Sequence, residues 1–172
     1  MGRKRNKLQG QIFSFIICFL FIENVNAASI EDNIDNHKNQ FQTIALKIWN
    51  HAELGYQENQ SSELLANALE KEGFTITRGV AGIPTAFIAE YGSGGPVIGI
   101  LGEFDALPGL SQTTSPFKEI ADNTSGGGHA CGHHLFGASS AWASVAIKEW
   151  LVESKTEGRI RFYGTPAEEG GS

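Results

Sequence analysis

The densest group of reactive side chains lies in the stretch Gly128-His129-Ala130-Cys131-Gly132-His133-His134. Cys131 and His133 are two residues apart, so in extended or irregular backbone their side chains can point to the same side. Gly132 lets the backbone bend between them. A thiolate and an imidazole suit a borderline-soft divalent cation such as zinc, and they tolerate manganese or nickel. The stretch therefore predicts two ligands of one metal ion.

Three other interpretations of this stretch stay open. Cys131 can be a small buried hydrophobic residue, with the histidines in a solvated loop. It can also be the nucleophile of a cysteine hydrolase, with a nearby histidine as the base. Gly126-Gly127-Gly128 can cradle a phosphate before a helix, although the Lys-Ser or Lys-Thr pair of a phosphate-binding loop does not follow. Inhibition by a chelator, with rescue by zinc or manganese, separates a metal site from a nucleophilic thiol.

Two adjacent carboxylates, Glu168 and Glu169, follow Pro166 after a predicted strand. Neighbouring side chains on a regular strand face opposite ways, but a turn after Pro166 can send one carboxylate to a metal ion and the other to its bound water. Hydrolysis needs this division, because one carboxylate holds the ion and another accepts the proton as water attacks. The alternative is that the pair belongs to a solvated surface.

Asp105 comes shortly after an apolar run at residues 97–101. In open α/β sheets, ligands collect beyond the carboxyl ends of strands. There Asp105 can accept a hydrogen bond from the far nitrogen of a metal-bound imidazole and so fix its tautomer. A helix or turn cap is the alternative role for this aspartate.

Helices and strands in mixed order must position these three groups. The apolar spacing predicts helices at 30–50, 59–72 and 135–152, and strands at 74–77, 85–91, 97–101 and 159–163. The run at 97–101 is apolar without alternation, which is typical of a strand buried on both faces. The loop from about 103 to 128 is long enough to indicate a functional role. This order predicts a layered α/β domain with helices on both faces of the sheet.

The third predicted helix carries an apolar stripe that we expect to face the core. Its members are Leu135, Ala138, Trp142, Val145, Ala146 and Val152.

The N-terminal segment has the pattern of a secretory signal peptide. Four basic residues precede an apolar run at 12–22, and Val25-Asn26-Ala27 offers the small residues that a signal peptidase reads. About 11 apolar residues are fewer than the roughly 20 that span a bilayer. We therefore expect a signal peptide at 1–27, a secreted or periplasmic protein, and no stable membrane span after cleavage.

The rest of the chain, residues 28–172, is acidic and has the length of one domain. Residues 1–27 hold four of the 13 basic and one of the 19 acidic residues, so the net charge without them is −9. That charge makes nucleic acid and anionic membranes poor partners. Cys131 is the one cysteine in this part, so it cannot form an internal disulfide.

The three groups together resemble the aminoacylase-like metallopeptidase family, which includes aminoacylases, acetylornithine deacetylase and the indole-acetyl-amino-acid hydrolases. The resemblance runs from the stretch Ile48-Trp49-Asn50-His51-Ala52-Glu53-Leu54-Gly55-Tyr56-Gln57-Glu58 to the paired glutamates. The stretch Gly102-Glu103-Phe104-Asp105-Ala106-Leu107-Pro108-Gly109-Leu110-Ser111-Gln112 is most similar to the p-aminobenzoyl-glutamate hydrolase B-subunit branch. The resemblance implies a three-layer αβα metallopeptidase catalytic domain, incomplete at its C-terminus.

The resemblance also implies a site for two divalent metal ions, zinc or manganese. By position, Cys131, His133 and Glu169 would be metal ligands. Glu168 would be the base that deprotonates the metal-bound water, and Asp105 would orient the site.

Three further residues are not assigned as metal ligands. Glu103 stands where the wider family places a ligand histidine, but this branch uses the cysteine-containing site, so Glu103 is not assigned to metal. His134 occupies a position that is usually Asp or Asn in the family, and its role stays open. His129 matches the branch and is expected to support the ligands without binding metal.

Members of the family are longer than this chain. Their inserted lid or dimerisation domain and further histidine ligands lie downstream of the paired glutamates. Residues 28–172 are therefore expected to form the N-terminal part of the catalytic domain. We expect the 172-residue chain alone to have little or no activity. The complete enzyme could form a homodimer.

The sequence thus predicts a metal-dependent amidohydrolase. Its substrate would be a small-molecule amide, namely an N-acyl or N-aroyl amino acid, or a dipeptide. The alternatives are a non-catalytic exported module that binds a metal or peptide, and a cysteine hydrolase that uses Cys131. Metal binding without hydrolysis of any substrate in a panel would favour the binding module.

Overall fold

The computed structural model of the protein describes residues 29–122 and 125–170. The predicted signal peptide at 1–27 lies outside these described residues. None of the described helices combines the length and hydrophobicity needed to cross a membrane.

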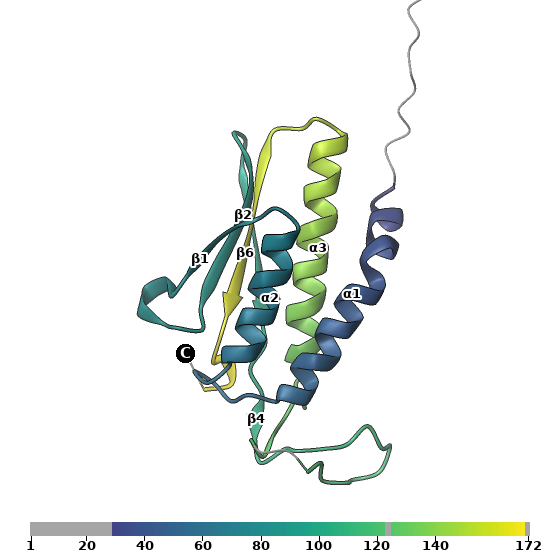
Figure 1. Cartoon of the computed structure of the whole chain (residues 1–172), viewed down its shortest axis with the longest axis vertical. Helices are drawn as coiled ribbons and strands as arrows, with labels where there is room; N and C mark the ends of the chain where they lie inside the picture. Colours follow the sequence, from purple (N-terminus) through teal and green to yellow (C-terminus); the bar gives the residue numbers. More distant parts are fainter. Residues whose placement is uncertain (1–28, 123–124, 171–172) are drawn as a thin grey trace, which may run out of the picture.

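Three long helices form where the apolar spacing predicts them (Figure 1). They are α1 (Ile30–His51), α2 (Asn59–Lys71) and α3 (His133–Glu153). A capping box starts α1, because the Ser29 hydroxyl accepts from the Asp32 N–H at 3.1 Å and the Asp32 carboxylate accepts from the Ser29 N–H at 3.2 Å. The third helix begins two residues earlier than predicted, so His133 lies in its first turn.

Four strands make one mixed sheet in the order β1-β2-β6-β3. They are β1 (Thr75–Arg78), β2 (Phe87–Ser93), β3 (Val97–Glu103) and β6 (Gly158–Thr165). The β1–β2 and β2–β6 pairs are antiparallel, and β3 runs parallel to β6. A mixed sheet with helices packed against it confirms the α/β class, but the described helices cover one face of the sheet, whereas the prediction places helices on both.

The core lies between the helices and one face of the sheet (Figure 1). Phe87 and Phe162 from the sheet are buried there with Phe41 from α1 and Leu65 from α2. The prediction that residues 97–101 are buried on both faces is wrong, since Ile98 is 54% and Leu101 is 56% exposed. The reason is that β3 is the last strand in the order and the described helices cover one face of the sheet.

The stripe of α3 that faces the core differs in part from the prediction. Ala138, Val145 and Ala146 are buried, Trp142 packs against the core, and Leu135 and Val152 are exposed. The remaining buried positions on the helix are His133 in its first turn and four small residues, namely Gly137, Ser140, Ala141 and Ser144. A Cβ on Gly137 would lie 2.5 Å from the carbonyl oxygen of Glu103. Small residues therefore let α3 approach β3 closely, and a search for large apolar residues overlooks them.

The strand β3, the helix α3 and the strand β6 bring the three sequence groups to one edge of the sheet. The register pairs Glu103 with Thr165, so the carboxyl ends of β3 and β6 lie side by side. The helix α3 connects these two parallel strands and begins at the same edge. The long loop between them is not without structure, because β4 (Leu107–Pro108) pairs antiparallel with β5 (Gly127–Gly128).

Candidate metal centre

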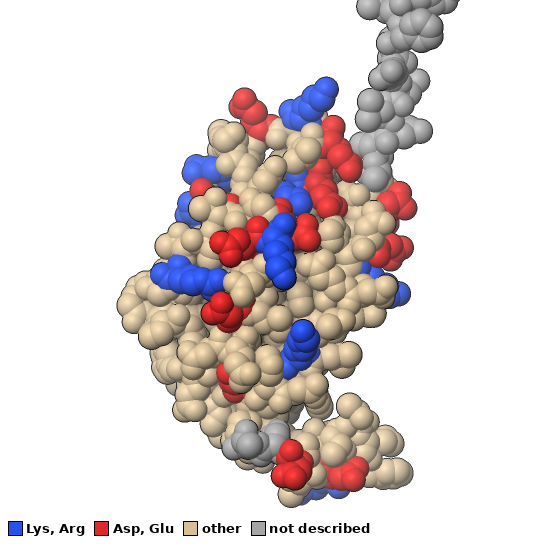
Figure 2. Space-filling view, viewed as in Figure 1, with Lys and Arg blue, Asp and Glu red and all other residues tan. Residues whose placement is uncertain are grey.

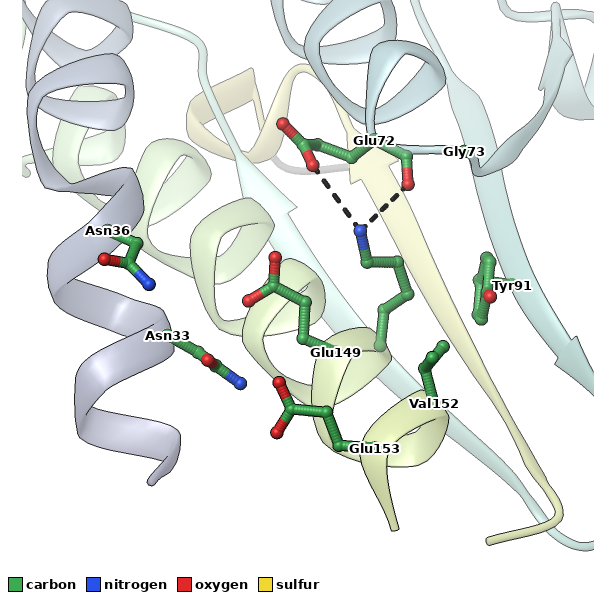
Figure 3. Close-up of a pocket in the computed structure, with 9 residues that line it drawn as sticks. Asn33, Asn36, Glu72, Gly73, Tyr91, Glu149, Val152 and Glu153 are labelled. Carbon is green, nitrogen blue, oxygen red and sulfur yellow. Dashed lines mark hydrogen bonds and ion pairs between the residues drawn. The ribbon is translucent and has the colours of Figure 1, made fainter. Parts of the chain in front are cut away.

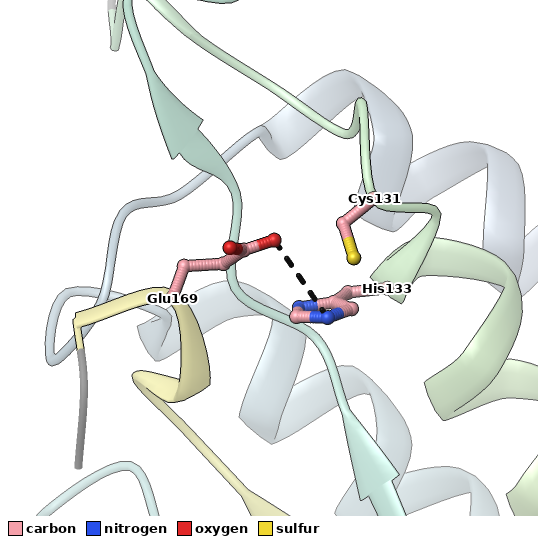
Figure 4. A group of neighbouring side chains, drawn as sticks. All are labelled: Cys131, His133 and Glu169. Carbon is pink, nitrogen blue, oxygen red and sulfur yellow. Dashed lines mark ion pairs between the residues drawn. The ribbon is translucent and has the colours of Figure 1, made fainter.

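The structure brings Cys131, His133 and Glu169 together at this edge (Figure 4). Their potential ligand atoms all lie within 4.8 Å of one another. Cys131 precedes α3, His133 lies in its first turn, and Glu169 lies in the short helix η2 (Glu168–Gly170) after β6. One ion can therefore reach a thiolate, an imidazole and a carboxylate from two distant parts of the chain.

Asp105 connects His133 to Glu169. Its Oδ1 lies 2.9 Å from His133 Nδ1, and its Oδ2 accepts a hydrogen bond from the Glu169 N–H at 2.9 Å. Because a carboxylate only accepts, this contact places the proton of a neutral His133 on Nδ1 and leaves the lone pair on Nε2. The imidazole is thus oriented as a metal-binding histidine is by its carboxylate partner.

Three more carboxylates lie near Nε2, the other ring nitrogen of His133. Its Nε2 lies 3.0 Å from Glu103 Oε2, 3.8 Å from Glu168 Oε2 and 3.8 Å from Glu169 Oε1. Glu103, His133 and Glu168 form a second group whose ligand atoms lie within 4.8 Å of one another.

Glu103 is the member of this cluster that sequence reasoning left out. Its position two residues before Asp105, at the end of a strand, was the available signal, because such residues point to the same side.

The donors at this edge fit a divalent cation. Burial raises the pKa of Glu103, and the carboxylates of Glu168, Asp105 and Glu169 raise it further, while His133 opposes the shift. The Oε1 atom of Glu169 is buried and has no hydrogen-bond partner among the described residues. A divalent cation would neutralise these crowded acids and give that oxygen a partner.

The thiol of Cys131 is less suited to act as a nucleophile. A hydrogen bond to Glu169, then partial desolvation and the negative charge of nearby carboxylates, raise its pKa. A cysteine nucleophile needs the opposite shift, since the thiolate is the reactive form. The side chain is also exposed, which excludes the interpretation of Cys131 as a buried hydrophobic residue.

The glycines before this stretch do not form a phosphate loop. Gly127 and Gly128 are buried in β5, and α3 begins only at His133. A phosphate cradle needs open backbone N–H groups at the first turn of a helix. The geometry therefore disfavours the phosphate interpretation.

His129 and His134 belong to a separate aromatic cluster. His129 Nε2 donates to the Ile48 carbonyl at 3.0 Å, and the rings of His134 and Trp49 meet edge to face at 4.9 Å. Burial lowers the pKa of His129 to about 4, and burial also lowers the pKa of His134. Neither histidine belongs to a ligand group among the described residues. His129 ties the stretch that contains Cys131 and His133 to α1.

The turn that presents Glu168 and Glu169 rests on the early stretch 53–58. Ala167 is fully buried with a left-handed φ of 61°. Its N–H donates to the buried Glu58 Oε1 at 2.8 Å. A Cβ on Gly55 would lie only 3.0 Å from Ala167 Cβ. This clamp on Ala167 was not evident from the sequence, because Glu58 lies 109 positions before it.

The chain is similar to known proteins in both sequence and fold. No family model matches the chain. It is 47% identical over 143 residues to the B-subunit of p-aminobenzoyl-glutamate hydrolase of Escherichia coli, a match that covers 83% of this chain and 30% of that protein. It is 37% identical over 121 residues to N-acetylcysteine deacetylase of Bacillus subtilis, a match that covers 69% of this chain and 30% of that protein.

A solved structure agrees with these relatives. The crystal structure of a dinuclear metal binding peptidase of the M20 family from Bacillus subtilis matches with a TM-score of 0.61 at 31% identity. The match covers 78% of this chain and 37% of that one. The chain therefore spans about a third of the length of these relatives.

Proposed function

Because this chain belongs to the aminoacylase-like M20 metallopeptidase family, we propose that it carries part of the active site of a metal-dependent amidohydrolase. The substrate class is an N-acyl or N-aroyl amino acid, or a dipeptide. The observation that carries the proposal is the convergence of Cys131, His133 and Glu169, with Asp105 behind them and Glu168 beside them.

Cys131, His133 and Glu169 would hold the metal, and Glu103 joins the candidate ligands through its contact with His133. Divalent ions such as zinc or manganese, two per complete site, would polarise the substrate carbonyl and acidify the attacking water. Asp105 holds His133 in the tautomer whose Nε2 faces the carboxylates.

Glu168 has the position of a general base. Its side chain is 51% exposed, and its Oε2 lies 3.8 Å from His133 Nε2, so it borders the cluster and still reaches solvent. It would accept the proton of the attacking water at a carboxylate oxygen and then donate it to the leaving amine nitrogen. Glu169 is oriented differently from Glu168. Its backbone N–H donates to Asp105, and its side chain points at Cys131 and His133 (Figure 4).

The test of this role is Glu168→Gln in the full-length protein. We expect hydrolysis of p-aminobenzoyl-glutamate and N-acetyl amino acids to fall by at least 100-fold, because general-base catalysis contributes about that much or more. Metal content, measured by elemental analysis, should stay unchanged. Glu157→Gln, an exposed carboxylate away from the cluster, is the matched control. Undiminished turnover in Glu168→Gln would remove Glu168 from the mechanism.

A binding module without catalysis is the second candidate, because Cys131, His133 and Glu169 can hold an ion whether or not hydrolysis follows. A full-length protein that binds metal and hydrolyses nothing across the panel would favour this candidate.

We propose export through the signal peptide at 1–27. The basic residues, the apolar run and the small residues before Ala28 support it. Mass spectrometry of the mature protein should find Ala28 as the first residue. A mature chain that retains the apolar run would contradict cleavage.

A further inference from the structure

A second group of possible metal ligands lies between the three helices, away from the site described above. His37 on α1, Glu72 directly after α2 and Glu149 on α3 each offer one ligand atom, and these atoms lie within 4.8 Å of one another. Glu149 comes sixteen residues after His133 on α3, which is roughly 24 Å along the helix at about 1.5 Å per residue. The two groups therefore cannot share an ion.

We propose that His37, Glu72 and Glu149 bind a structural divalent cation of the zinc class. One imidazole and two carboxylates form a ligand set that zinc accepts in proteins, with water as a fourth ligand. Each ligand comes from a different helical segment, so the ion would tie α1, α2 and α3 together.

The geometry of the three side chains supports this assignment. His37 Nε2 lies 2.7 Å from Glu149 Oε1, and His37 Nδ1 lies 3.8 Å from Glu72 Oε1. All three side chains are largely shielded from solvent, with exposed fractions of 17%, 18% and 24% for His37, Glu72 and Glu149. The His37 ring also packs edge-on against Phe41, which limits its rotation.

An independent observation comes from Asn33, one helical turn before His37. Its side chain is only 3% exposed, and its Nδ2 has no hydrogen-bond partner among the described residues. Figure 3 shows this amide directed towards the carboxylate of Glu153, on the same side of the cavity as Glu149. Glu153 Oε2 is likewise buried and without a partner there. A water molecule on the cation would accept from Asn33 and donate to Glu153, and so satisfy both groups.

The space and the charge beside this group of ligands are also suitable for a divalent cation. Asn33, Glu72, Glu149 and Glu153 line a cavity of about 510 Å³ (Figure 3). The one basic side chain in its lining is Lys148, and its Nζ is engaged by the Glu72 carbonyl at 3.1 Å and the Glu72 carboxylate at 3.5 Å. Figure 2 shows acidic and basic side chains mixed over the half of the molecule where α3 ends, so the excess lies in the lining of the cavity, where Glu72, Glu149 and Glu153 face one lysine. The cavity therefore carries excess negative charge that a divalent cation would balance.

The experiment is a zinc titration of the 172-residue chain carrying His133→Gln, which removes the imidazole common to both ligand groups of the first site. Calorimetry should find one zinc ion bound through the second site. Adding His37→Gln or Glu149→Gln should weaken that binding at least tenfold, because each removes a ligand. Glu63→Gln removes an exposed carboxylate of α2 and should leave the affinity unchanged.

A measurement without substitutions at the second site covers the case in which a variant fails to fold. Paramagnetic Co²⁺, added to the His133→Gln chain, should broaden the NMR signals of the His37 ring before those of His129. Zinc binding that persists undiminished in both His37→Gln and Glu149→Gln would overturn the proposal. So would an unbroadened His37 ring, and the contact would then be an ordinary His37–Glu149 ion pair.

Discussion

Among single residues, Asp105 does most to assemble the candidate metal centre. It is buried, and its two carboxylate oxygens contact His133 from α3 and the backbone of Glu169 from the last segment. One side chain thus fixes the orientation of a predicted ligand and the position of another. Its role in the reaction stays a prediction, but its contacts give it a measurable consequence for metal affinity.

Asp105→Asn should lower the affinity for zinc by about 10- to 100-fold, the usual effect of altering the partner of a metal-bound histidine. An asparagine amide can donate to Nδ1 instead of accepting from it, which favours the wrong tautomer of His133. Competition with a chromophoric chelator measures the affinity. Asp122→Asn, at an exposed position in the long loop, is the control. Equal affinities in the two variants would contradict the contact.

Glu58 gives a prediction for stability against pH. Burial raises the pKa of this carboxyl above its ordinary value of 4.5. Because the folded state holds the proton more tightly than the unfolded state, this contribution to stability is present below about pH 4.5 and is lost as the pH rises through the folded-state pKa.

Glu58→Gln should therefore gain stability relative to wild type as the pH rises from 4 towards 7. Glutamine keeps an acceptor oxygen for the Ala167 N–H and carries no charge to bury. Urea unfolding at several pH values measures the difference, with Glu63→Gln as the exposed control. A stability difference that does not change with pH would show that burial leaves the Glu58 pKa unaltered.

At the level of the elements, the close contact of α3 with β3 places His133 beside Glu103. The small residues of α3, above all Gly137, allow this approach. A larger side chain would separate the helix from the strand end and open the cluster. The core face of this helix is thus selected for small size as well as for hydrophobicity.

Gly137→Ala should destabilise the protein by about 1–3 kcal/mol, as overpacking typically does. The added Cβ would lie 2.5 Å from the Glu103 carbonyl oxygen. Helix propensity alone predicts the reverse, since alanine is the better helix former by about 1 kcal/mol. Ser139→Ala, on the exposed side of the same helix, should be neutral or stabilising. Thermal unfolding of both variants distinguishes the effects, and a stabilised Gly137→Ala would contradict the packing.

At the level of the whole molecule, the described helices cover one face of the sheet and leave β3 open along its outer edge. Val97, Ile98 and Leu101 of this strand are exposed apolar side chains. An uncovered apolar edge strand is a template for pairing with other chains. The 172-residue chain should therefore self-associate as its concentration rises.

Ile98→Lys should reduce this association, because a charge on an edge strand opposes pairing. Sedimentation velocity over a concentration series measures it. Leu46→Lys introduces the same charge at another exposed apolar position, on α1, and should have a smaller effect. If both variants associate as wild type does, β3 is not the contact surface.

The sequence by itself determined the order of helices and strands and the grouping of reactive residues at three strand or helix ends. Both follow from local patterns: the spacing of apolar residues, the glycine and proline boundaries, and short stretches such as Cys131-Gly132-His133. The convergence of Cys131, His133 and Glu169 was predicted through the family resemblance.

The tertiary structure alone decided which other residues lie in or near the cluster and which strand is exposed. It brought Glu103 into the cluster, placed His129 and His134 outside it, and set Glu58 beneath Ala167. It also left β3 exposed where the apolar run predicts burial. These outcomes depend on which distant segments pack together and how closely, and side-chain periodicity carries no information on contacts between segments tens of residues apart.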